Sequence, residues 1–149
     1  MKRRDYAILF LIALMAIFFG YQLASSFGKT QKNVTYRAIE NWSDFNDKAN
    51  RQSFNDEDIY LVARQWEWSP ALELKAGQSY ILHVASEDIQ HAFHLEKGAT
   101  GQSIDVLLQP KTEYIIPLKI EQEGQYAIGC TQYCGIEHNK MRSRIIVRK

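Results

Sequence analysis

Four side chains able to bind a soft metal ion are concentrated in one short segment, "CTQYCGIEHNKM", at residues 130–141. The segment holds both cysteines of the chain, one of its 4 histidines and one of its 3 methionines. Cys134, His138 and Met141 supply a thiolate, an imidazole and a thioether. These are three of the four ligands of a blue-copper centre, in which one cysteine and two histidines form a plane and a methionine lies on its axis. The residue types therefore predict a copper centre in this segment.

The second histidine of such a centre must come from elsewhere, and "EDIQHAFHLEKG" offers His91 and His94 at the end of a strand. Cys130 is one thiolate too many for a single blue-copper ion. Two thiolates four positions apart can bridge two copper ions, each of which keeps one terminal histidine. Such a pair shares one electron and changes its bond lengths little on reduction, so it suits rapid electron transfer.

Three simpler interpretations compete with the copper pair, and one of them is a single copper ion. Zinc accepts Cys130, Cys134, His138 and one further histidine as a tetrahedral set, but the usual cysteine spacing is C-x-x-C and zinc has no use for Met141. A Cys130–Cys134 disulfide is compatible with an exported domain. It leaves the histidine and the methionine unexplained, so we favour the copper pair.

The elements that position these ligands are short β-type runs separated by turn residues. They begin at Ile59 and read "IYLVARQWEW", "ALELKAGQ", "SYILHVAS", "SIDVLLQP", "TEYIIPLKI", "GQYAIGC" and "RSRIIVRK". No convincing helix lies between them, which indicates an all-β antiparallel sandwich or Greek-key barrel. The ligand-bearing segment is then a loop between the last two strands, at one end of the sandwich.

The N-terminus predicts a membrane anchor. No residue from Tyr6 to Ala24 is charged, and a run of this length crosses a bilayer core as a helix. Three basic residues precede it, at positions 2, 3 and 4, and such clusters stay in the cytoplasm. We expect residues 1–27 to form a cytoplasmic stub and a single transmembrane helix, with the rest of the chain on the outer, periplasmic side. The alternative is a cleaved secretory signal.

Residues 28–58 are polar and poor in large apolar side chains, which predicts a connector ahead of a domain at 59–149. Ile39, Trp42 and Phe45 recur within it at a helical spacing, so a short amphipathic helix can form there. The formal net charge of the whole chain is +1, without the basic stripe that nucleic-acid binding requires. Without the first five residues, one acidic residue is in excess, and the outer part is close to neutral.

The segment "GQYAIGCTQYCGIEHNKM" resembles the copper-binding loop of cytochrome c oxidase subunit II, whose dinuclear CuA centre has the pattern C-x-x-x-C-x-x-x-H-x-x-M. "IQHAFHLE" is similar to the ligand-bearing strand end of that family, and "ARQWEWSP" to its aromatic segment. The resemblance covers roughly residues 59–149 and implies a cupredoxin fold. "HAFH" and "CTQYCG" are most similar to the compact ba-type branch, which has one membrane helix instead of a hairpin of two.

The resemblance implies two copper ions and assigns their ligands position by position. Cys130 and Cys134 are the bridging thiolates, and His91 and His138 are the terminal imidazoles. Met141 is a weak thioether ligand of one ion, and the backbone carbonyl of Gln132 is a weak ligand of the other. The mitochondrial-type pattern has a glutamate between the cysteines, whose side chain helps to hold magnesium. Here that residue is Gln132, whose neutral amide is a poorer ligand for a hard cation, so we expect no magnesium.

Four further residues, two histidines and two tryptophans, are weaker candidates for a functional role. An offset of three along a strand directs His91 and His94 to opposite faces, so we expect His94 to support the site from outside or to face a partner. His83 lies in the middle of a strand and is expected to be structural. Trp66 and Trp68 are expected on one face of their strand, either as a point where electrons enter or as core, with at least one of them in the core.

The resemblance implies the subunit at which electrons enter a haem–copper terminal oxidase. A donor such as cytochrome c reduces the copper pair, and a haem in the large subunit I receives the electron for oxygen reduction. This chain, an oxidoreductase component, then carries no oxygen-reducing site of its own. The rivals are the same module in a membrane nitric oxide reductase and a copper-delivery protein. The latter needs neither Met141 nor His91.

Overall fold

The computed structural model describes residues 3–30, 34–53 and 55–149, in two units that divide after Asn33. The first unit is helix α1 (Arg3–Thr30). Its segment Asp5–Ser25 has a mean hydropathy of 2.3 and is long and apolar enough to cross a membrane, judged by length and composition alone. A secretory signal near an N-terminus has the same properties, so the alternative of a cleaved signal stays open.

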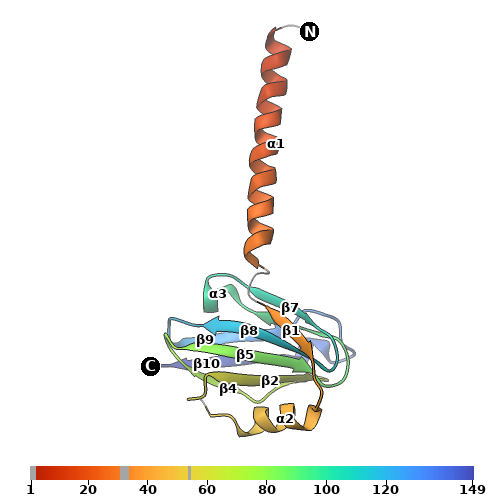
Figure 1. Ribbon diagram of the computed structural model, residues 1–149, viewed down its shortest axis with the longest axis vertical. Coiled ribbons are helices and arrows are strands. Elements are labelled where there is room, and N and C mark those ends of the chain that lie inside the picture. Colours follow the sequence, from red (N-terminus) through yellow and green to blue (C-terminus); the bar gives the residue numbers. More distant parts are fainter. Residues whose placement is uncertain (1–2, 31–33, 54) are drawn as a thin grey trace. The chain divides into compact units, whose positions relative to one another are not determined.

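The second unit, from Val34 to Lys149, contains two five-stranded sheets (Figure 1). Sheet A has the order β1-β8-β5-β2-β3, with bounds Thr35–Ala38, Thr112–Lys119, Ser79–Ser86, Asp58–Arg64 and Glu67–Ser69. Sheet B has the order β4-β10-β9-β6-β7, with bounds Leu72–Lys75, Arg142–Arg148, Gly124–Cys130, His91–Leu95 and Ile104–Leu108. Short helices α3 (Lys97–Thr100) and η1 (His138–Lys140) lie in connections.

Two of the strand pairings differ from the expected antiparallel arrangement. β2 pairs with β5 and β4 pairs with β10 in parallel, whereas the other pairings between named strands are antiparallel. A parallel pair needs a long crossover connection. Here β3, the edge strand of sheet A, and β4, in sheet B, lie between β2 and β5 in the sequence. The chain thus crosses to sheet B at β4 and returns to sheet A in the direction of β2.

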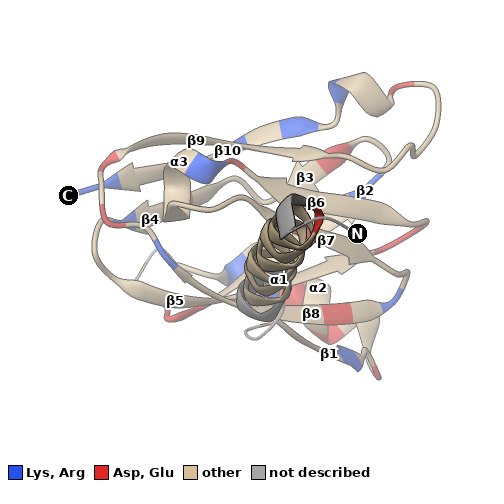
Figure 2. Cartoon of the chain, turned by 90° about the horizontal axis from the view of Figure 1, so that it is seen from above, with Lys and Arg blue, Asp and Glu red and all other residues tan. Residues whose placement is uncertain are grey.

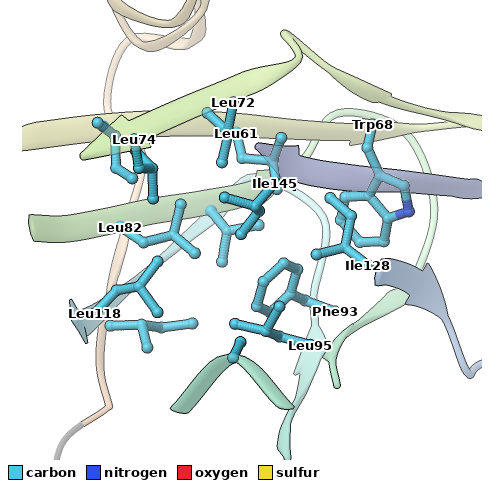
Figure 3. Packing of buried hydrophobic residues seen from close by; sticks show 14 of the residues in the cluster. Leu61, Trp68, Leu72, Leu74, Leu82, Phe93, Leu95, Leu118, Ile128 and Ile145 are labelled. Atoms are coloured by element: carbon cyan, nitrogen blue, oxygen red, sulfur yellow. The ribbon is translucent and has the colours of Figure 1, made fainter. Parts of the chain in front are cut away.

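The core lies between the two sheets and is filled by alternating apolar positions of their strands. Figure 3 shows Leu61, Leu82, Leu95 and Ile145 converging from both sheets. Trp68 packs edge-on against Phe93, with ring centroids 5.7 Å apart. Two residues of the candidate metal loop, Cys134 and Met141, belong to the same buried cluster. The loop is therefore anchored in the core.

Helix α2 (Trp42–Arg51) covers the outer face of sheet A (Figure 1). The side chain of Asn41 caps its first turn by accepting hydrogen bonds from the backbone N–H groups of residues 43 and 44, at 3.0 and 3.4 Å. Phe45 and Ala49, one turn apart, are buried against Val62 and Ala85. Residues 34–53, within the segment expected as a connector, thus contribute β1 and α2 to the compact unit.

Candidate metal centre

The residues expected to bind metal converge at one end of sheet B. β9 ends at Cys130, which is opposite Phe93 of β6, and β6 begins two residues earlier, at His91. β10 begins at Arg142, opposite Gly129 of β9. The loop between β9 and β10 therefore leaves and re-enters the sheet beside the strand that carries His91. Strand register brings together ligands that are far apart in the sequence.

The six expected donors fall into two groups of three. In the first, the Cys130 thiol lies 3.8 Å from His91 Nδ1 and donates to the Gln132 carbonyl oxygen at 3.0 Å. In the second, Cys134 Sγ lies 3.5 Å from His138 Nδ1 and 3.7 Å from Met141 Sδ. Ligand atoms of His91, Cys130 and Cys134 all lie within 4.8 Å of one another, which joins the groups.

This donor set suits copper better than zinc. Thiolates and a thioether are soft ligands, which select copper, and imidazole binds it as well. A structural zinc ion takes four donors in a tetrahedron and would leave Met141 and the Gln132 carbonyl without a purpose. His91 and Met141 have no exposed surface and Cys134 is 1% exposed, whereas Cys130 and His138 are half-buried. The site is thus shielded from water on its inner side.

Asp88 hydrogen-bonds the ring nitrogen of His91 that faces away from the thiols. His91 Nε2 donates to Asp88 Oδ1 at 2.9 Å, which leaves Nδ1 directed at the thiols. A carboxylate on the far nitrogen of a metal-binding histidine fixes its tautomer and ring orientation. Burial raises the pKa of Asp88, but the N–H groups of Gln65 and Ile89 and the His91 ring outweigh it and lower the pKa. Asp88 is therefore an ionised acceptor at neutral pH.

The two thiols differ in acidity. Burial raises the pKa of Cys130, but the interaction with the His91 ring and the hydrogen bond from the Ala92 N–H outweigh it and lower the pKa to about 7. Burial and the charge on Cys130 raise the pKa of Cys134. Copper binds the thiolate form, so a metal ion must displace the proton of Cys134.

Trp66 and Trp68 do not share one strand, contrary to expectation. Trp66 lies with Gln65 in the turn between β2 and β3, and its indole N–H donates to the Cys134 carbonyl oxygen at 3.1 Å. Trp68 lies in β3, is 6% exposed and donates to the Met141 carbonyl oxygen at 3.4 Å. Trp68 is a core residue, as expected for at least one of the pair, whereas Trp66 is half-buried against the loop.

The two histidines outside the expected ligand set have carboxylate partners. His94 Nδ1 lies 2.7 Å from Asp105 Oδ1, on β7, and is half-buried. His83 is 7% exposed, with Nδ1 2.6 Å from Glu113 Oε1 and Nε2 3.0 Å from Asp58 Oδ1. His83 thus has the surroundings of a structural residue.

Comparison with known proteins was made in sequence and in structure. No family model matches the chain. It is 28% identical over 117 residues to a protein of Thermus thermophilus named cytochrome c oxidase subunit 2, covering 78% of this chain and 84% of the relative.

Two solved structures show the fold. A chain of a heme-copper terminal oxidase dimer matches with a TM-score of 0.60 and 18% identity, covering 99% of this chain and all of that one. The periplasmic domain of subunit II of cytochrome oxidase from Bradyrhizobium japonicum matches with a TM-score of 0.54 and 16% identity, covering 63% of this chain and 85% of that one. These findings confirm the resemblance drawn from the loop: the chain is similar to cytochrome c oxidase subunit 2, with a cupredoxin-like β-fold after one apolar N-terminal helix.

Proposed function

We propose that this chain is the subunit at which electrons enter a haem–copper terminal oxidase, through two copper ions bound at the end of sheet B. The thiolates of Cys130 and Cys134 would be shared between the ions, and the imidazoles of His91 and His138 would each hold one of them. Met141 and the Gln132 carbonyl would be the weaker ligands. One observation carries the proposal: each thiol has its own imidazole nitrogen and its own weaker donor within 3.8 Å.

When bound, the copper pair supplies a one-electron carrier between an external donor, cytochrome c or a similar protein, and a haem of the large subunit I. The residues of this chain would hold the site in place and shield its inner side from water. Met141 and His91 are fully buried, and Asp88 orients the His91 ring. Because the ligands are held in place, they move little when the charge on the copper pair changes. Rapid electron transfer requires such small rearrangement.

The proposed location follows from α1 and from the relatives. α1 anchors the chain in the inner membrane by a single pass, with the basic N-terminus in the cytoplasm and the copper domain in the periplasm. The similarity to an oxidase subunit supports a large-subunit partner and membership of an oxidoreductase complex. Oxygen reduction belongs to that partner in this proposal, and magnesium is not among the expected ions.

Removing one thiol at a time tests the number of metal ions. In Cys130→Ser, the second group of donors stays complete and, with His91, forms a blue-copper set. We expect the full chain in detergent to bind close to two copper ions as wild type and one as Cys130→Ser. The optical and paramagnetic resonance spectra should change from those of a mixed-valence pair to those of a single copper–thiolate site.

Two further variants complete the test. Cys134→Ser should lose more copper, because it removes the thiol that lies between His138 and Met141. His94→Ala is the control and should keep both ions, since His94 pairs with Asp105. A wild-type chain that binds one zinc ion tightly and no stable copper pair would refute the proposal. A single colourless Cu(I) would instead indicate copper delivery.

A further inference from the structure

Gln65 contacts both segments that carry the deepest candidate ligands. It lies in the turn that follows β2, and its backbone N–H donates to Asp88 Oδ2 at 2.8 Å. Its side-chain Nε2 donates to the Cys134 carbonyl oxygen, also at 2.8 Å. One residue thus binds the end of the β5–β6 connection through its main chain and the β9–β10 loop through its side chain.

Both contacts lead directly to donors of the metal centre. Asp88 is the residue that accepts the hydrogen bond from His91 Nε2, so the main-chain contact acts on the ring orientation of His91. The side-chain contact is on the peptide of Cys134 itself, whose Sγ faces His138 and Met141. The distance between the two ligand-bearing segments therefore depends on where Gln65 holds each of them.

The loop backbone fits closely against this turn. Gly135 has a φ of +116°, which side-chain-bearing residues rarely adopt. A Cβ atom there would lie 3.1 Å from Gln65 Nε2 and 3.2 Å from the Trp66 ring. The absence of a side chain at this position allows both N–H donors of the turn to reach the same carbonyl oxygen of Cys134.

We infer that Gln65 is a positioning residue of the copper pair: it sets the placement of Cys134 relative to His91. The inference rests on the proposed function. Trp66 also donates a hydrogen bond to the carbonyl oxygen of Cys134. Of these two residues, only Gln65 also contacts Asp88. A change in this side chain shifts the thiolate of Cys134 relative to the imidazole of His91, while all six donors stay present.

The test compares Gln65→Leu with Gln102→Leu in the full chain, loaded with copper in detergent. Both replace an exposed glutamine by an apolar residue of similar size, and Gln102 lies in the turn after α3. We expect Gln65→Leu to keep two copper ions but to change the copper hyperfine pattern, shift the reduction potential and weaken copper affinity about tenfold, as loss of a supporting hydrogen bond at a metal site does. Gln102→Leu should match wild type in all three.

A second variant separates positioning from folding. Gln65→Lys restores a side-chain N–H donor and should return the hyperfine pattern towards that of wild type. If Gln65→Leu lowers the melting temperature and leaves spectrum and potential unchanged, Gln65 is merely structural and the inference is refuted. A wild-type chain without a copper pair would refute the proposed function instead, so the two failures are distinguishable.

Discussion

Replacing Asp88 by alanine should weaken copper binding although Asp88 is not itself a ligand. Its carboxylate accepts hydrogen bonds from His91 Nε2 at 2.9 Å, from the Gln65 N–H at 2.8 Å and from the Ile89 N–H at 2.7 Å. In Asp88→Ala the His91 ring loses the partner that fixes its tautomer and orientation. Its buried Nε2–H also loses its acceptor.

The expected magnitude follows from these contacts. Loss of the carboxylate behind a metal-binding histidine costs about 10–100-fold in metal affinity, or about 1.4–2.7 kcal/mol. A hydrogen bond to a charged group contributes about 1.5–3 kcal/mol to stability. The Asp88 side chain is 30% exposed, and water can replace part of what is lost. We therefore expect the free energy of unfolding of the metal-free chain to fall by about 2 kcal/mol.

Copper affinity is measured by competition with a chelator, and stability by thermal denaturation of the metal-free chain. Asp105→Ala is the matched control, because Asp105 forms the same kind of pair with His94, at 2.7 Å, in an exposed position. Exposed ion pairs contribute about 0–1 kcal/mol to stability, so Asp105→Ala should change stability little. Copper affinity should not change, because His94 is not an expected ligand. Equal copper affinity in Asp88→Ala and wild type would refute the reasoning that Asp88 orients His91.

Three other perturbations have defined outcomes. Apparent copper affinity should fall about tenfold per pH unit as pH falls towards 7, because the metal displaces the proton of Cys134. It should fall more steeply below the pKa of Cys130 at about 7, because the proton of Cys130 must then be displaced as well, and a pH-independent affinity would contradict this. Burial raises the pKa of Glu113, but Arg37 and His83 outweigh it and lower the pKa below the ordinary 4.5. Its contribution to stability is therefore full above that pH and disappears as pH falls through the lowered pKa. Glu113→Gln should destabilise the chain by about 1.5–3 kcal/mol at pH 7 and by progressively less as pH falls below 4.5, as denaturant titrations can check. The association rate of a basic donor should depend weakly on ionic strength, since Lys, Arg, Asp and Glu are interspersed over the domain (Figure 2); a steep fall with salt would reveal a clustered charged face.

The sequence was most informative where chemistry is local. Cys130, Cys134, His138 and Met141 lie within one loop, so their spacing alone indicates a soft-metal site, and alternating strands place that loop at the end of a sandwich. Asp88 followed a strand and resembled an ordinary turn residue. Its role depends on the ring of His91, which only tertiary packing brings within hydrogen-bond distance.

The turn at Gln65 and Trp66 was missed because neither glycine nor proline marks it in "IYLVARQWEW". The roles of these two residues follow from a loop about seventy positions later in the chain, to which both donate hydrogen bonds. Helix α2 has a weak sequence signal for a different reason. It buries only one narrow stripe, Phe45 and Ala49 with Trp42 partly buried beside them, and its other residues are polar.

The burial of Cys134 and Met141 in the main hydrophobic cluster limits how fast a bound metal can leave. We expect a chelator in solution to reach the half-buried Cys130 and His138 directly, but to reach the inner donors only when the sandwich opens. At high chelator concentration the exchange rate should therefore stop rising and equal the rate of that opening. It should also share the steep temperature dependence of unfolding, several-fold for every ten degrees. For the proposed copper ions, we expect retention to be a kinetic property of the whole domain, so core mutations far from the loop should shorten the residence time of the metal.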